Sequence, residues 1–81
     1  MNIFIGNLNY RLDVEAVEQL FAEYGQVDSV KIISDRETGR SKGFGFVEMP
    51  NDSEGEAAIE GLNGSEVMER AMVVNQARPR E

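Results

Sequence analysis

The stretch Lys42-Gly-Phe-Gly-Phe-Val-Glu-Met49 carries most of the information on how this chain folds. It reads as a β-strand, whose side chains point alternately to its two faces. Pro50 ends the strand, because proline has no N–H to donate to a sheet. One face of the strand then carries Lys42, Phe44, Phe46 and Glu48, and the other carries Gly43, Gly45, Val47 and Met49.

Outward from this strand the chain divides into alternating strands and helices. Apolar, β-rich stretches predict strands at 2–5, 27–34, 42–49 and 72–76. Apolar residues three and four positions apart predict helices over 13–24 and 51–62, the first capped by Asp13 and the second by Asn51 or Asp52. Gly55 and Gly61 each weaken the second helix by about 1 kcal/mol relative to alanine.

The order βαββαβ predicts an α+β, ferredoxin-like fold, with both helices on one face of an antiparallel sheet. The apolar side chains of the first strand, Ile3 and Ile5, then join Val47 and Met49 against the helices. By elimination, Phe4, Phe44 and Phe46 project from the uncovered face, where burying each ring would yield about 1.5–3 kcal/mol. A cluster of this kind usually marks a binding surface.

Composition limits the possible functions. A chain of 81 residues, 41% hydrophobic and 28% charged, forms one small globular domain. It has no cysteine and no histidine, so we expect no disulfide, no metal site, no cofactor and no enzymatic activity. The sequence shows neither an apolar run of membrane-spanning length nor a signal peptide, so we expect an intracellular protein with no membrane partner.

The net charge of −7 is unevenly distributed along the chain. Both helical stretches, 13–24 and 51–62, carry acidic residues and no basic ones, whereas basic residues gather at 31–42 and 78–80. If the helices lie on one side of the sheet, the molecule is a dipole. The acidic residues are then ordinary solvated side chains, or they repel phosphates and restrict nucleic acid to the other face.

The exposed rings suit unpaired nucleobases, which stack on aromatic side chains whatever their identity. Basic residues near such a face can meet the phosphates, and polar side chains can meet base edges. Duplexes fit poorly, because rings displayed on a sheet need splayed bases. The basic residues of the loop are alternatively a solvated hairpin tip, and those of the tail a solubilising end.

Two motifs resemble those of a known family, the RNA recognition motif. Ile3-Phe-Ile-Gly-Asn-Leu8 is similar to its RNP hexamer, and Lys42–Met49 to its RNP octamer, although the octamer favours an aromatic residue where Met49 stands. The flanking 35–42 and 58–64 segments also match, so the resemblance covers nearly the whole chain. It implies a four-stranded sheet of order 4-1-3-2, and the overall form is most like small single-domain RNA-binding proteins of cyanobacteria, other bacteria and plant organelles.

The resemblance implies a role for each matching residue. Phe4 and Phe46 correspond to rings that stack on successive bases, Phe44 to a ring that packs against sugars, and Lys42 to a phosphate contact. We expect one domain over 1–81, with its core at about 1–77 and a short basic tail at 78–81. The predicted RNA-binding residues are Asn2, Phe4, Lys31, Arg36, Arg40, Lys42, Phe44, Phe46, Asn75, Gln76, Arg78 and Arg80.

Binding of single-stranded RNA is therefore the leading hypothesis, with single-stranded DNA as an alternative. A second hypothesis is a protein-interaction module that uses the same face or the acidic helices, because the fold alone does not specify function. We expect a monomer, or a weak homodimer. The expected location is the bacterial cytoplasm, or an organelle or the nucleus in a eukaryote.

Overall fold

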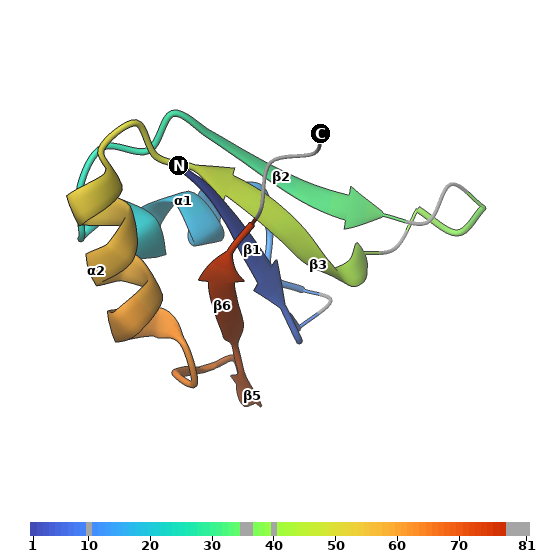
Figure 1. Ribbon diagram of the computed structural model, residues 1–81. Coiled ribbons are helices and arrows are strands. Elements are labelled where there is room, and N and C mark those ends of the chain that lie inside the picture. Colours follow the sequence, from blue (N-terminus) through green and yellow to red (C-terminus); the bar gives the residue numbers. More distant parts are fainter. Residues whose placement is uncertain (10, 35–36, 40, 78–81) are drawn as a thin grey trace.

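The computed structural model describes residues 1–9, 11–34, 37–39 and 41–77 (Figure 1). The side chains of Ser34, Ser41 and Lys42 are outside this description. The main elements are β1 (Asn2–Gly6), α1 (Val14–Ala22), β2 (Ser29–Ser34), β3 (Ser41–Glu48), α2 (Asp52–Leu62) and β6 (Val73–Gln76). A small hairpin, β4 (Glu66–Val67) and β5 (Arg70–Ala71), lies between α2 and β6.

The main sheet has the strand order β2-β3-β1-β6, and all its neighbouring strands are antiparallel. This confirms the predicted order 4-1-3-2, with β6 as the fourth strand. Both helices lie on the same side of the sheet, α1 against β2 and α2 against β6 (Figure 1). The other face carries no helix, as the ferredoxin-like arrangement predicts.

The core lies between the sheet and the helices. Ile3, Ile5, Val47 and Met49 are all buried, which confirms the predicted assignment of strand faces. From the helices, the buried side chains that meet them are those of Val17, Phe21, Ala58 and Leu62. The phenylalanines of β1 and β3 are not part of this core cluster.

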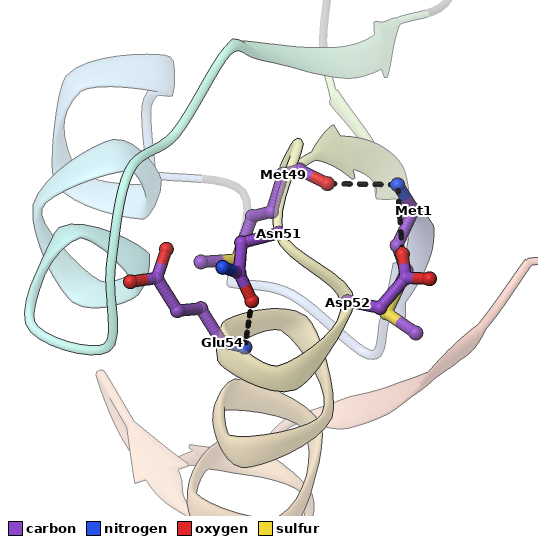
Figure 2. A network of polar contacts seen from close by, with 5 residues as sticks. All are labelled: Met1, Met49, Asn51, Asp52 and Glu54. Carbon is purple, nitrogen blue, oxygen red and sulfur yellow. Dashed lines mark hydrogen bonds and ion pairs between the residues drawn. The ribbon is translucent and has the colours of Figure 1, made fainter.

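The two helices begin where the sequence predicts and are capped by side-chain oxygens. Asp13 accepts a hydrogen bond from the backbone of Ala16 at 2.9 Å. Asn51, rather than Asp52, caps α2 and accepts from the backbone of Glu54 at 3.1 Å (Figure 2). These contacts satisfy N–H groups that have no partner within the helix.

The amino group of Met1 joins the start of β1 to the segment after β3. It donates to the carbonyl of Met49 at 2.7 Å and lies 3.7 Å from the carboxylate of Asp52 (Figure 2). The side chain of Met1 packs on α2, where a Cβ on Gly55 would overlap its sulfur. Gly61 makes room in the same way for the hydroxyl of Tyr24. The two glycines that weaken α2 by propensity are therefore explained by packing.

Some element boundaries differ from the prediction. The helix expected to reach Tyr24 ends at Ala22, because the backbone of Tyr24 donates to Phe21, three residues back, and tightens the last turn. β2 begins at Ser29 rather than at residue 27. The β4–β5 hairpin was not predicted: the sequence indicated only a turn at Asn63-Gly64 before the last strand.

Candidate nucleic-acid interface

Three phenylalanine rings form a cluster on the sheet face opposite the helices. Phe4 of β1 pairs with Phe46 of β3, and Phe44 lies two residues before Phe46 on the same strand. The rings of Phe4 and Phe44 are stacked, with centroids 6.3 Å apart, and Phe46 meets Phe4 edge-on at 5.8 Å. Phe46 is 39% exposed, and Phe4 and Phe44 are half-buried. The cluster thus remains accessible from solvent.

Two glycines shape the backbone beneath these rings. A Cβ on Gly6 would come within 3.0 and 3.2 Å of ring carbons of Phe4, so the ring leans over the bare backbone at the end of β1. A Cβ on Gly45 would overlap the carbonyl oxygen of Lys31 in β2. Gly45 therefore allows β2 and β3 to approach closely beside the rings.

The strand register determines which predicted polar residues share the face with the rings. Residues directly opposite each other in an antiparallel pair lie on the same face. Lys31 is opposite Phe46, and Asn75 is opposite Phe4, so the sheet brings both to the aromatic face. Both side chains are exposed.

Asn2 also lies on this face, at the end remote from Gly6. It is opposite Glu48, whose carboxylate accepts a hydrogen bond of 3.4 Å from the Ser29 hydroxyl. Gln76, in contrast, is opposite Ile3, whose side chain is buried on the helix side. The register therefore does not bring Gln76 together with the rings.

The strand alternation that placed Lys42 beside the rings is interrupted by a β-bulge. Pairing steps from Ile33 opposite Phe44 to Ser34 opposite Ser41, so Lys42 and Gly43 are extra residues on β3. Gly43 has a φ of +82°, which favours glycine. The Lys42 side chain is outside the described part of the structure, as are Arg36, Arg40, Arg78 and Arg80.

Comparisons with known proteins agree with this geometry. The family model of the RNA recognition motif matches residues 3–73. RbpB of Nostoc sp. is 54% identical over 81 residues, which are 100% of this chain and 79% of RbpB. The crystal structure of RNA Binding Protein PG1 is 48% identical with a TM-score of 0.94, and covers 100% of this chain and 98% of that one. This chain belongs to the RNA recognition motif family.

A further similar structure is an RNA recognition motif in complex with its ligand. The structure of the Rna15 motif with bound RNA (GU) is 27% identical, with a TM-score of 0.87, and covers 96% of this chain and 83% of that one. RbpB is one of several similar cyanobacterial Rbp proteins, so the predicted resemblance to small cyanobacterial proteins is confirmed.

The structure of this RNA recognition motif adds residues to the site that the sequence did not indicate. Ile33 lies opposite Phe44 on the aromatic face and is half-buried. Beyond Phe4, an open pocket of about 570 Å³ lies at the end of β1. Its lining residues are Phe4, Gly6, Asn7, Gly43, Phe44, Arg70 and Val73.

These residues differ in whether a sequence signal could have found them. Val73 could have been found, because it is two residues before Asn75 on the same strand and therefore shares its face. Ile33 could have been found by the same alternation relative to Lys31. Arg70 could not, because the hairpin that carries it was not predicted.

Charge separates the two sides of this motif. The exposed acidic residues of α1 and α2 lie on the helix side, whereas the described cations near the rings are Lys31 and Arg70. The part of the chain that the structure describes holds no group of three or more metal-ligating side chains. No helix within that part has the length and hydropathy needed to cross a membrane.

Proposed function

We propose that this protein binds single-stranded RNA by stacking two successive bases on Phe4 and Phe46, with Phe44 against the sugar between them. The observation that carries this proposal is the cluster of three rings on the open face of the sheet. A contiguous apolar patch that is open to solvent usually marks an interaction site.

Chemistry on the same face supports the proposal. Lys31 lies opposite Phe46, within reach of a phosphate that accompanies a stacked base. Asn75 lies opposite Phe4, where an amide can donate to and accept from a base edge. The predicted contacts of Lys42, Arg36, Arg40, Arg78 and Arg80 with phosphates belong to the same proposal.

Magnitudes indicate a moderate affinity. Two stacking contacts contribute about 1–3 kcal/mol each. With a few phosphate contacts, binding reaches about −8 kcal/mol, a Kd of about 1 μM. Since few phosphates are neutralised, the slope of log K against log salt is about two to four.

The test is a titration of fluorescent RNA heptamers with the protein and two ring variants. We expect Phe4→Ala and Phe46→Ala each to weaken binding about tenfold or more, because each removes a stacking platform. The matched control is Val14→Ala, since Val14 is 42% exposed but lies on α1, on the other side of the sheet. Unchanged binding by both ring variants would overturn the stacking mechanism.

We propose further that the protein is a monomeric binding module in the bacterial cytoplasm, with its core at about 1–77 and a short basic tail at 78–81 that adds the phosphate contacts of Arg78 and Arg80. The backbone of Ala77 still donates to Asn2 at 2.8 Å, which supports placing the end of the core there. Rings accept both nucleic acids, so single-stranded DNA of the same sequence is the comparison ligand. Light scattering in the same experiment distinguishes monomer from weak homodimer.

A further inference from the structure

The β4–β5 hairpin is tied to the loop that follows β1 by three side chains. The amide of Asn7 donates to the carbonyl of Ala71 at 2.8 Å, and the amide of Asn9 donates to Met68 at 2.9 Å. In the other direction, the guanidinium of Arg70 donates to the carbonyl of Leu8 at 3.4 Å. The hairpin is therefore held in one position beside the end of β1.

The turn of this hairpin has an unfavourable backbone. Its two central residues, Met68 and Glu69, have φ values of +50° and +70°. Residues other than glycine and asparagine adopt this region at a cost, and such conformations persist where the surrounding structure imposes them. Val67 pairs with Arg70, so Met68 and Glu69 form a two-residue hairpin turn of the type that needs positive φ at both positions. This turn sets the place of the residue that follows it, Arg70.

Arg70 lies at the edge of the aromatic cluster. It lines the pocket of about 570 Å³ together with Phe4, Phe44 and Val73. This volume lies within the range of small-ligand sites and is sufficient for a nucleotide. Aromatic and aliphatic side chains and the amide of Asn7 form the walls, and Arg70 is the charged residue among the lining side chains. Such a pocket suits a ligand that has a flat apolar group to lie against the rings and an anionic oxygen to meet Arg70.

We propose that this pocket is a nucleotide subsite, in which Arg70 binds the phosphate of the nucleotide whose base stacks on Phe4. The inference rests on the proposed RNA binding and assigns a residue that lies outside both RNP motifs. A guanidinium carries five N–H donors in a rigid fork that matches a phosphate. The hydrogen bond to the carbonyl of Leu8 orients the guanidinium, and the hydrogen-bonded hairpin keeps it beside the ring of Phe4.

With this subsite, the aromatic face has a cationic side chain near each of two rings, Lys31 and Arg70. Lys31 lies beside Phe46 on β2, and Arg70 lies beyond Phe4 at the end of β1. A strand whose bases stack on Phe4 and Phe46 would then have a phosphate contact near each ring. This compensates locally for the net charge of −7, which disfavours nucleic acid overall.

The experiment compares salt dependence among variants of Arg70, using labelled RNA heptamers. We expect Arg70→Ala and Arg70→Gln each to weaken binding about tenfold and to reduce the salt slope by about 0.7, the contribution of one phosphate on a single strand. Arg70→Lys should keep the slope and recover only part of the affinity, because an ammonium lacks the fork.

The matched control is Arg11→Ala, which removes the same charge from a neighbouring pocket lined by Asn9, Met68 and Glu69. We expect it to leave both affinity and slope unchanged. Arg70→Lys keeps the positive charge on a long side chain, so its salt slope tests the phosphate contact even if Arg70→Ala and Arg70→Gln loosen the hairpin. Thermal unfolding of each variant shows whether the fold is intact.

The outcomes separate this inference from the proposed function. If the Phe4→Ala and Phe46→Ala variants lose RNA while Arg70→Ala and Arg70→Gln bind like the unaltered protein, the subsite is wrong and RNA binding stands. Weaker binding by Arg70→Ala and Arg70→Gln with an unchanged salt slope would also overturn it, because no phosphate contact would have been lost. Failure of the unaltered protein to bind RNA would remove the proposed function and the subsite together.

Discussion

Phe4 depends on the absence of a side chain two residues further along its strand. Its ring lies over Gly6, and Val73 of the neighbouring strand borders the same space. A ring that we propose as a stacking platform is therefore positioned by a residue that has no side chain. The effect is steric, since Gly6 is not among the residues with positive φ.

We expect Gly6→Ala to weaken RNA binding several-fold, with a change in unfolding free energy of less than about 1.5 kcal/mol. The added methyl would lie 3.0 Å from the ring of Phe4, and the ring can move away only by leaving its stacked position. Fluorescence titration and urea unfolding measure the two effects. The control is Gln19→Ala, an exposed change on α1, on the other side of the sheet. Full affinity in the Gly6→Ala variant would show that the ring position is not critical.

At the scale of elements, the main sheet is held by its own strand pairing, whereas the short β4–β5 hairpin depends on contacts with the rest of the chain. β1 and β3 are paired over four residues each, and Gly45 permits β2 to approach β3 closely. The β4–β5 hairpin has only two paired residues on each strand, which is too short to be stable alone. Its position depends on the hydrogen bonds from Asn7, Asn9 and Arg70.

We expect the double substitution Met68→Asn, Glu69→Gly to stabilise the protein by about 1 kcal/mol. Asparagine and glycine are the residues that two-residue hairpin turns with positive φ prefer. Thermal or urea unfolding measures the gain, and RNA affinity should not change because neither side chain lines the ring pocket. A loss of stability would mean that the side chains of Met68 and Glu69 contribute contacts that outweigh the backbone cost.

Over the whole molecule, the acidic helices and the aromatic face are separated by the thickness of the domain. The shortest dimension is 18 Å. The Debye length is about 8 Å at 0.15 M salt and about 30 Å at 0.01 M. The carboxylates of α1 and α2 should therefore repel RNA only at low salt. We therefore expect the acidic residues to repel phosphates at 0.01 M salt and to behave as ordinary solvated side chains at 0.15 M.

We expect the triple variant Glu18→Gln, Glu56→Gln, Glu60→Gln to bind RNA several-fold more tightly at 10 mM salt and equally at 150 mM. All three side chains are exposed on the helix side. The comparison variant is Glu48→Gln, which removes a carboxylate from the ring face and should increase affinity at both salt concentrations. An equal gain for the triple variant at both concentrations would place RNA close to the helices.

Sequence alone predicted that both helices cover one side of the sheet and that three rings lie on the other. The assignment of strand faces follows from local regularities, because side chains alternate along a strand and recur every three to four residues along a helix. The strand order came instead from the resemblance to the family. The buried set Ile3, Ile5, Val47 and Met49 agrees with that alternation. The two RNP motifs pointed to the family for the same reason, since each lies within one continuous segment.

Tertiary structure decided what depends on pairing between distant segments. The β-bulge interrupts the alternation that placed Lys42, and the register of β6 against β1 separates Asn75 from Gln76. Arg70 reaches the rings through a hairpin that three side-chain hydrogen bonds hold beside residues about sixty positions earlier in the chain. Periodicity describes one segment at a time, whereas these positions result from contacts that form only when the segments meet.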